Sequence, residues 1–316
     1  RGMGKNEQNQ HKKAIEDFTR ALDIDSTMAL AYYHRGISKA SLKDYAGSIK
    51  DYTRAIELGG ENLEALMNRV EAKSELKDYQ GAIKDYSKIL ELDPKNVAAY
   101  LTRGKFKMKL EDYEGAIYDF DQLLQIDSDH VEALVQRGIS KSKMSRHQDA
   151  LPDFDKALAL DQDNALAVYR KGIAFMHMGK NQKAQNLFTS AITKNPDYAD
   201  AFYARGVSKA MAGSHQASIK DLSRAIEYDS TFAEAYYNRG VSKGILKRHA
   251  EAIKDYDRAI ELKPDYGAAY YNRGVSYIAL NYFEDGCKDL YRSKDLGIAA
   301  ADEKINIYCK QTYKDQ

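Results

Sequence analysis

Charged residues recur at fixed positions along this sequence, and their types would suit either proton transfer or ion pairing. A basic residue returns every 34 residues: Arg1, Arg35, Arg69, Arg103, Arg137, Lys171, Arg205, Arg239 and Arg273. Four residues after each of these stand Lys5, Lys39, Lys73, Lys107, Lys141, Phe175, Lys209, Lys243 and Tyr277. Sixteen residues after each of the first set stand Asp17, Asp51, Asp85, Asp119, Asp153, Leu187, Asp221, Asp255 and Asp289.

The sixth copy indicates how these columns are related, because Lys and Asp are replaced there together by Phe175 and Leu187. A carboxylate buried without its cation is costly, so direct contact between the two positions predicts a joint replacement. We therefore predict Asp–Arg and Asp–Lys pairs in the other copies and a Phe175–Leu187 contact in the sixth. The alternative is a relay of acid and base groups or a phosphate-binding stripe, but structural ion pairing is favoured.

Histidine and cysteine provide no evident metal site or nucleophile. His11, His147, His215 and His249 occupy the same position of different copies, where other copies carry Tyr. Equivalent positions of packed helical units lie about 10 Å apart, whereas zinc ligands lie roughly 2 Å from the ion, so we predict turn residues. Cys287 and Cys309 are either two buried thiols, which burial statistics favour, or a disulfide in an exported protein. No catalytic constellation is apparent, so we expect no enzyme, no cofactor and no metal.

The elements that position these charges repeat with the same period of 34 residues. Glycine recurs at Gly2, Gly36, Gly104, Gly138, Gly172, Gly206, Gly240 and Gly274, with Val70 as the exception. Twelve residues later comes a small column: Ala14, Ser48, Ala82, Ala116, Ala150, Ala184, Ser218, Ala252 and Gly286. Four residues further comes a large one: Phe18, Tyr52, Tyr86, Phe120, Phe154, Phe188, Leu222, Tyr256 and Leu290. Small residues let two antiparallel helices approach where they cross, and the large residue fills the adjacent groove.

This pattern, with Pro94, Pro196 and Pro264 after second helices, resembles the tetratricopeptide repeat. The resemblance implies an all-α fold, one continuous α-α superhelix (solenoid) of about nine 34-residue helix–turn–helix repeats. We expect a truncated first repeat over 1–28, mainly its second helix, and a C-terminal capping helix over 299–316. The eight repeats between them are expected at 29–62, 63–96, 97–130, 131–164, 165–198, 199–232, 233–266 and 267–298.

Composition excludes some partners. The net charge of +1 gives no long-range attraction to phosphate backbones, so we expect no nucleic-acid binding. No apolar run approaches the roughly 20 residues that cross a bilayer, so we expect no membrane span. The first residues read as the middle of a repeat, so the N-terminus is expected to be truncated and the compartment stays open. An uncapped first repeat would also allow self-association.

The resemblance implies which surface would bind a partner, because first helices line the concave side in this family. Applied here, it predicts a groove in repeats six to nine formed by Tyr169, Ile173, Met176, Tyr203, Val207, Met211, Tyr237, Asn238, Val241, Tyr271, Asn272 and Val275. Tyrosine buries much area at low entropic cost, and each Asn offers one donor and one acceptor to a peptide backbone. The alternative is that the tyrosines pack between repeats and bind nothing.

We therefore predict a protein-interaction scaffold that binds a segment of a protein partner in its concave groove. One alternative is an adaptor that clamps a C-terminal carboxylate; Asn68, Asn238 and Asn272 fit one position of that clamp, but its basic residues are missing. Another is the regulatory arm of a larger enzyme. The groove of repeats three to five is expected to be polar, with Glu64, Glu71, Glu75, Lys105, Lys109 and Lys143.

Overall fold

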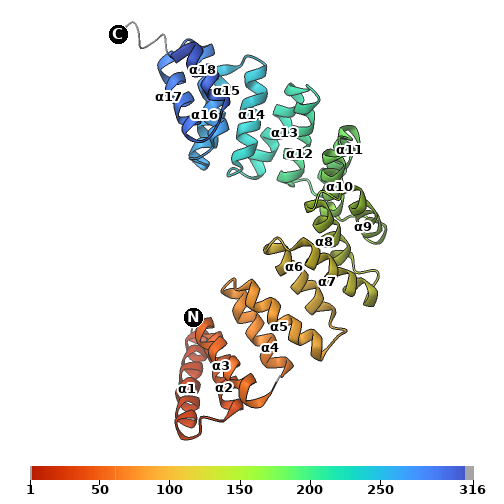
Figure 1. Ribbon diagram of the computed structural model, residues 1–316, viewed down its shortest axis with the longest axis vertical. Coiled ribbons are helices and arrows are strands. Elements are labelled where there is room, and N and C mark those ends of the chain that lie inside the picture. Colours follow the sequence, from red (N-terminus) through yellow and green to blue (C-terminus); the bar gives the residue numbers. More distant parts are fainter. Residues whose placement is uncertain (1, 61, 310–316) are drawn as a thin grey trace. The chain divides into compact units, whose positions relative to one another are not determined.

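The computed structural model describes residues 2–60 and 62–309, with side chains from residue 9 onward, and the described residues form helices and turns without strands (Figure 1). The chain divides into two compact units, Arg1–Leu160 and Asp161–Gln316. The first contains α1 (Gly2–Ile24), α2 (Ala29–Ser41), α3 (Tyr45–Gly59), α4 (Leu63–Glu75), α5 (Tyr79–Leu92), α6 (Val97–Lys109), α7 (Tyr113–Ile126), α8 (Val131–Lys143) and α9 (His147–Leu160). The second contains α10 (Ala165–His177), α11 (Asn181–Lys194), α12 (Ala199–Met211), α13 (His215–Tyr228), α14 (Ala233–Ile245), α15 (His249–Leu262), α16 (Gly267–Ala279), α17 (Phe283–Asp295), α18 (Ala300–Lys304) and the π-helical turn η1 (Ile305–Cys309).

Within each unit, consecutive helices pack side by side, so each helix pair rests on the pair before it. In the first unit α2 pairs with α3 and α4 with α5, and in the second α14 pairs with α15 and α16 with α17. First helices of neighbouring pairs also touch directly, as α2 touches α4 and α14 touches α16. The predicted all-α solenoid of helix–turn–helix repeats is therefore confirmed.

The turn inside each helix pair has one recurrent conformation. A residue with positive φ recurs every 34 positions, at Lys43, Lys77, Glu111, Ser145, Gly179, Gly213, Lys247 and Asn281. After Lys43, Lys77 and Glu111 an aspartate follows and caps the second helix: the Asp44 carboxylate accepts from the Gly47 N–H at 2.9 Å, and Asp78 does the same for Gly81. A left-handed residue followed by an N-cap reverses the chain in the fewest residues and starts the next helix.

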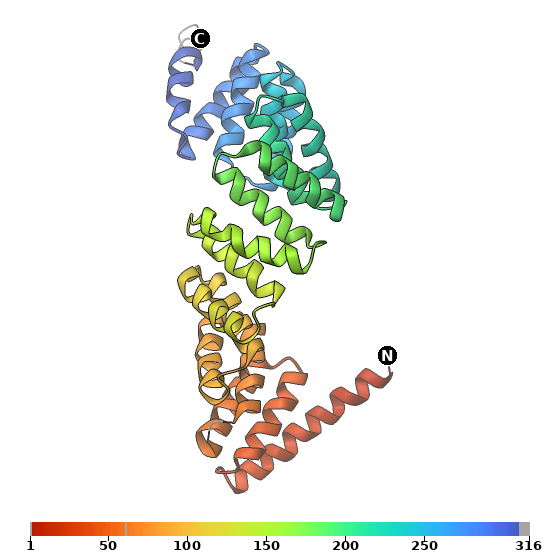
Figure 2. The same cartoon turned by 90° about the vertical axis from the view of Figure 1, so that its right-hand side faces the viewer.

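Helix α1 departs from the predicted truncated repeat. It is one continuous helix of 23 residues with no internal turn (Figure 2). Asn9 and Gln10 stand where the next three repeats have a left-handed residue and a capping Asp, and Gln is a weaker N-cap than Asp. His11 lies inside this helix, so its prediction as a turn residue is wrong. In the described part of the chain, no helix has both the length and the apolar character that a bilayer crossing demands.

The packing predicted from the small and large columns is confirmed. Ala116 and Ala150 are fully buried where the helices of their pairs cross. A Cβ placed on Gly104 would lie 2.7 Å from Cε1 of Phe120, which is closer than side chains approach one another. Glycine is therefore required where the aromatic ring of the second helix lies against the first helix.

The C-terminal cap is held to the last helix pair covalently. A disulfide joins Cys287 of α17 to Cys309 of η1, so the favoured prediction of two buried thiols is wrong. Both sulfurs are buried beside Leu290 and Ile305, and burial alone does not distinguish a thiol from a disulfide. The predicted capping helix is observed from Ala300 to Cys309, and its residues 310–316 lie outside the described residues.

Candidate functional site

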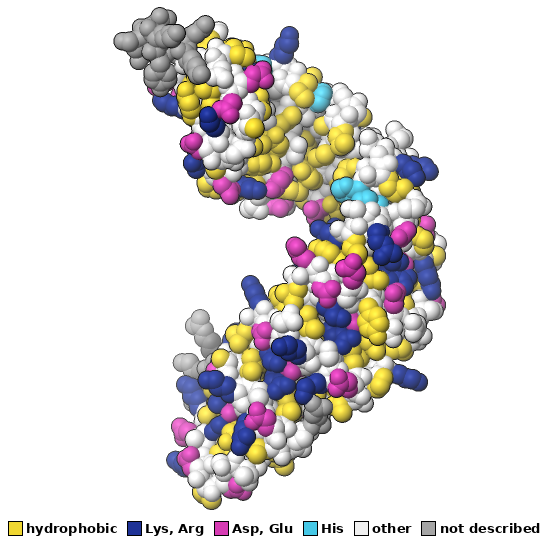
Figure 3. All heavy atoms as spheres, viewed as in Figure 1, with side chains coloured by type: hydrophobic (Ala, Val, Ile, Leu, Met, Phe, Trp, Pro, Cys, Tyr) yellow, Lys and Arg dark blue, Asp and Glu magenta, His cyan; other side chains and the backbone are white. Residues whose placement is uncertain are grey.

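A cleft between first helices α14 and α16 opens on the surface of the second unit. It measures about 200 Å³, and Val241, Ile245, Tyr256, Asn272 and Val275 are among the residues that line it. Tyr256 comes from the second helix α15 and is 2% exposed. Hydrophobic side chains gather on this unit's visible face, whereas charged side chains are mixed with them on that of the first unit (Figure 3).

The first unit contains the same cleft twice, at equivalent positions of its repeats. The cleft between α2 and α4 measures about 330 Å³ and is lined by Ile37, Ser41, Tyr52, Asn68 and Glu71, among others. Each of these five stands 204 residues, or six repeats of 34, before its counterpart in the α14–α16 cleft. The cleft between α4 and α6 measures about 460 Å³ and repeats this lining one repeat later, with Glu71, Glu75, Tyr86, Thr102 and Phe106.

The clefts follow from the repeat pattern. Gly240 of α14 has no side chain, so the Tyr256 ring of α15 lies directly against α14 and reaches its outer face. A Cβ on Gly240 would lie only 2.7 Å from Cε1 of Tyr256. One turn later stands the small residue Gly244, where other repeats have Ala40 or Ser74. A large ring with little side chain above it leaves a hollow that the next repeat closes on one side only.

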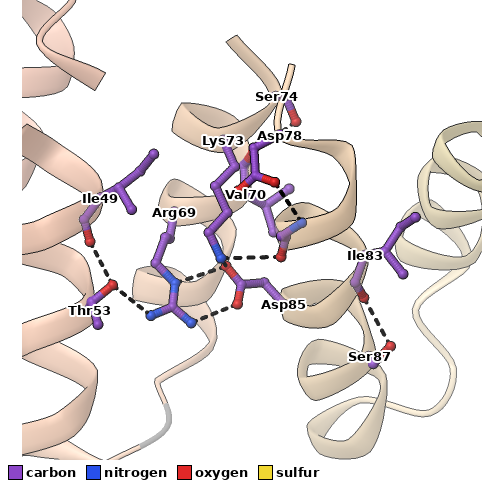
Figure 4. A network of polar contacts seen from close by, with 11 residues as sticks. Ile49, Thr53, Arg69, Val70, Lys73, Ser74, Asp78, Ile83, Asp85 and Ser87 are labelled. Atoms are coloured by element: carbon purple, nitrogen blue, oxygen red, sulfur yellow. Dashed lines mark hydrogen bonds and ion pairs between the residues drawn. The ribbon is translucent and has the colours of Figure 1, made fainter. Parts of the chain in front are cut away.

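Beneath this surface the predicted ion pairs connect the two helices of each repeat, and we call them the ion-pair ladder. The Asp85 carboxylate accepts from Nε and Nη2 of Arg69 at 2.8 and 2.6 Å, and Nζ of Lys73 lies 2.6 Å away (Figure 4). Equivalent Arg–Asp–Lys groups centre on Asp51, Asp119, Asp153, Asp221 and Asp255. The ladder prediction is confirmed for these repeats, and each carboxylate is almost completely buried.

The two end repeats differ. Arg273 binds Asp289 without a Lys, as predicted, and burial raises the pKa of Asp289 although the Arg273 guanidinium opposes the shift. The predicted pairing of Arg1 and Lys5 with Asp17 lies outside the described residues.

The sequence reasoning missed a second partner of each arginine. Nη1 of Arg69 donates to Oγ1 of Thr53 at 3.0 Å, and Thr53 belongs to the preceding repeat. The same contact recurs between Arg239 and Ser223 and between Arg273 and Asp257. The signal was present as a column of polar residues with a period of 34: Thr19, Thr53, Ser87, Asp121, Asp155, Thr189, Ser223 and Asp257. The arginine thus joins successive repeats as well as the two helices of one repeat.

In the sixth repeat the ladder is replaced by an apolar group under two lysines. The ammonium groups of Lys180 and Lys183 lie 5.8 and 5.7 Å from the centre of the Phe175 ring, within the range of cation–π attraction. Phe175 and Leu187 are both half-buried. Their predicted mutual contact stays a prediction.

The predicted groove residues occupy three environments. Tyr169 is only 8% exposed and packs against Phe188 and Tyr198, so it belongs to the core of the second unit and offers little surface to a partner. Met211 is 66% exposed. The others are half-buried: Ile173, Met176, Tyr203, Val207, Tyr237, Asn238, Val241, Tyr271, Asn272 and Val275. Tyr271 and Val275 also pack against the buried cluster that contains the Cys287–Cys309 disulfide. Binding by this set stays a prediction.

Tyr203 and Tyr237 each contact the residue that precedes the first helix of the next repeat. The Tyr203 ring lies 4.6 Å from that of Phe232, and the Tyr237 ring lies 4.8 Å from that of Tyr266. Burial raises the pKa of both tyrosines, because a phenolate is poorly solvated in such packing. The alternative interpretation, in which these rings pack inside the protein and bind nothing, therefore holds for the part of each ring that is buried in these contacts.

Asn238 and Asn272 are positioned by the same tyrosines. Nδ2 of Asn238 donates to the Tyr203 hydroxyl at 3.1 Å and to the Glu234 carbonyl at 2.8 Å. Nδ2 of Asn272 likewise donates to the Tyr237 hydroxyl and to a carbonyl of its own helix. Both amide N–H groups of each Asn are thereby used within the chain, and the predicted binding of a guest backbone by Asn238 and Asn272 stays a prediction. Only the carbonyl oxygen is left as an acceptor.

Histidines at the turn position do not form a metal site. His147, His215 and His249 are the first residues of α9, α13 and α15, beside the predicted turn. Nδ1 of His215 and of His249 is buried and makes no hydrogen bond. Across residues 9–60 and 62–309, no three His, Cys, Asp or Glu side chains converge on a possible metal position.

Comparison with known sequences identifies one repeat family along most of the chain. Family models of the tetratricopeptide repeat match residues 29–59, 63–96 and 97–130, residues 135–177 and 169–234, and residues 233–266. The segments that start at residues 29, 63, 97 and 233 begin with α2, α4, α6 and α14, and the other two begin inside α8 and α10. No curated protein matches the sequence significantly.

Several solved structures share the fold. A tetratricopeptide repeat protein from Parabacteroides merdae is 19% identical with a TM-score of 0.64, and the match covers 78% of this chain and 98% of that one. PilW, a type IV pilus biogenesis factor, is 21% identical with a TM-score of 0.58, over 65% of this chain and 94% of that one. A chain of the APC/C hetero-tetramer Cut9–Hcn1 is 14% identical with a TM-score of 0.62, over 91% and 57%. At these identities the likeness shows the fold alone.

Proposed function

Because this chain belongs to the tetratricopeptide-repeat family, we propose that it is a protein-interaction scaffold that binds an extended segment of a partner on the first-helix face of its second unit. Repeats of this family are generally non-catalytic interaction modules. The observation that carries the proposal is the cleft between α14 and α16, because it combines apolar walls with a buried aromatic floor.

The chemistry of this face suits an apolar side chain on an extended segment. Met211 is 66% and Ile245 is 56% exposed, although both are large hydrophobic residues. Covering them and the walls formed by Val241 and Val275 would contribute about 1.5–3 kcal/mol for each side chain fully buried. The carbonyl oxygen of Asn272 is an acceptor at the same cleft, so it would accept a backbone N–H of the guest.

A clamp for a C-terminal carboxylate gains no support from the geometry. Such a clamp needs amide donors directed at the guest, and the Nδ2 groups of Asn238 and Asn272 are engaged by tyrosine hydroxyls and helix carbonyls. We therefore propose recognition of an internal segment through its side chains.

The test is selection from a random library of displayed peptides of about twelve residues. The wild-type chain is expected to enrich peptides with spaced apolar residues, and the double variant Met211→Glu with Ile245→Glu should bind them about tenfold more weakly, because it places charge on the apolar face. Tyr291→Glu is the matched control, since Tyr291 is 42% exposed but lies on the second helix α17. Equal binding by the double variant and the wild type would contradict the proposed surface.

A further inference from the structure

The clefts of the first unit carry charge where the equivalent cleft of the second unit is apolar. Glu71 lines both the α2–α4 and the α4–α6 cleft, and its counterpart six repeats of 34 later is Val275. Glu75, one turn further along α4, corresponds to Ala279. Both glutamates are exposed, and within the described part of the chain neither carboxylate has an ion-pair partner.

The cations of the first helices α2 and α4 are already held by the ion-pair ladder. Nζ of Lys39 lies 2.7 Å from Asp51, and Nζ of Lys73 lies 2.6 Å from Asp85. Both lysine side chains are less than one-fifth exposed. They are fixed between the paired helices and do not reach out to pair with Glu71 at the first-helix face.

The floor of the α2–α4 cleft adds an unpartnered polar group. Tyr52 is 2% exposed and lines the cleft, yet its hydroxyl makes no hydrogen bond to any described residue. Burial raises the pKa of Tyr52 to about 12, and the nearby Glu71 charge adds to the shift. The oxygen of this hydroxyl is reached from the open side of the cleft, where it can accept a hydrogen bond from a bound donor.

The remaining wall also presents an acceptor. Nδ2 of Asn68 donates to the Tyr33 hydroxyl at 3.1 Å, and that hydroxyl donates to the Glu64 carboxylate at 3.3 Å. This chain of hydrogen bonds directs the amide N–H group of Asn68 toward Tyr33. Three hydrogen-bond acceptors therefore surround one cleft of about 330 Å³: the side-chain carbonyl oxygen of Asn68, the Glu71 carboxylate and the Tyr52 oxygen.

We propose that the α2–α4 cleft binds the Lys or Arg side chain of a protein partner. These side chains combine an apolar stem with a head that only donates hydrogen bonds. The stem would lie on Ile37 and Ala72, and the cationic head would meet Glu71 and the oxygen of Tyr52. The inference rests on the proposed function as a binder of protein segments, and it adds the chemical class of residue that the first unit selects.

The experiment uses the same displayed peptide library with the full chain. The wild type is expected to enrich peptides that contain Lys or Arg. Glu71→Gln keeps the shape of the side chain but removes its charge, so it should lower that enrichment about tenfold, because a charge-assisted hydrogen bond is lost. Glu57→Gln is the control, because it removes one exposed charge from α3 that pairs with Arg54 at 3.1 Å. Val275→Glu should create a preference for basic peptides in the second unit.

The affinity of one enriched peptide is then compared with that of its Lys→Gln or Arg→Gln version, for the wild type and for Glu71→Gln. Loss of the basic residue should weaken binding to the wild type about tenfold and leave binding to Glu71→Gln nearly unchanged. Enriched peptides whose basic residue shows no such coupling would overturn this inference and leave the proposed function standing. Failure of every version to enrich any peptide would overturn both.

Discussion

Replacement of Asp119 by Leu tests whether the ion-pair ladder holds the fold together. Asp119 is fully buried, and it accepts from Nε and Nη2 of Arg103 at 3.0 and 2.6 Å and lies 2.9 Å from Nζ of Lys107. Asp119→Leu leaves two cations, each at most 15% exposed, without their carboxylate. Removing one partner of a buried ion pair typically costs about 3–5 kcal/mol of unfolding free energy.

The surviving contacts set the expected value at the lower end of this range. Arg103 keeps its bond to Oγ of Ser87 at 3.0 Å, and Lys107 keeps its bond to the Gly115 carbonyl at 3.2 Å. We therefore expect a loss of about 3 kcal/mol for Asp119→Leu.

The sixth repeat supplies the compensated version of the same site. Combining Arg103→Lys, Lys107→Phe and Asp119→Leu copies Lys171, Phe175 and Leu187, which stand at these positions two repeats later. This triple variant removes the buried Lys–Asp pair and leaves one cation on a flexible Lys side chain that can extend toward solvent, so it should lie within about 1 kcal/mol of the wild type. The expected recovery is then roughly 2 kcal/mol.

The assay is urea unfolding followed by helical circular dichroism, with hydrogen exchange of α6 and α7 amides as a local readout, because repeat arrays lose structure unit by unit. Glu114→Leu on the exposed face of α7 is the control and should change stability by less than about 0.5 kcal/mol. A cost below about 1 kcal/mol for Asp119→Leu, or a triple variant as unstable as the single one, would refute the reasoning.

Two further predictions concern pH and the cap. Burial raises the pKa of Tyr52 and of Tyr198 to about 12, above the ordinary value of 10, so the stability linked to these groups is complete below pH 10 and is lost as the pH rises through 12. Absorbance at 295 nm should therefore show tyrosines that ionise late, together with loss of helix. Titration of every tyrosine near pH 10 in the folded chain would contradict this prediction. Cys309→Ser removes the disulfide that closes a loop with a sequence separation of 22, which should lower the free energy of unfolding by about 3 kcal/mol. Hydrogen exchange should become faster in α18 but not in α2. Unchanged exchange in α18 would show that apolar packing alone holds the cap.

The ion-pair ladder was predictable from the sequence because its members share one repeat and change together. Phe175 and Leu187 mark the two positions as neighbours without any coordinates. The second partner of each arginine, such as Thr53 for Arg69, belongs to the preceding repeat, and its distance depends on how far one helix pair is rotated on the next. That rotation is set by side-chain packing and not by the period, which is why the contact was missed.

Other features depend on information that the periodic pattern lacks. The cap disulfide requires η1 to fold back on α17, and nothing in the spacing of Cys287 and Cys309 fixes that direction. The clefts depend on which ring lies under which small residue, as Tyr256 lies beside Gly244. Helix α1 is continuous although Asn9 aligns with Asn281, which adopts the left-handed conformation in the last turn, so the residue types at the turn do not reveal this local departure.

The tyrosine column reconciles the two interpretations offered by the sequence. Tyr203 and Tyr237 pack against Phe232 and Tyr266, the residues that cap α14 and α16, and their hydroxyls accept from Asn238 and Asn272 of those helices. These contacts fix the separation of successive first helices before any guest arrives.

A surface that is already ordered loses less conformational entropy on binding, so the same atoms contribute more to affinity. The tyrosines therefore act on recognition through the spacing and the amide orientation that they impose on the cleft walls. By this argument Tyr33, which accepts from Asn68 in the same way, prepares the acidic cleft of the first unit, and a Tyr33→Phe variant that frees the Asn68 amide would weaken selection of basic side chains without removing any group that touches them.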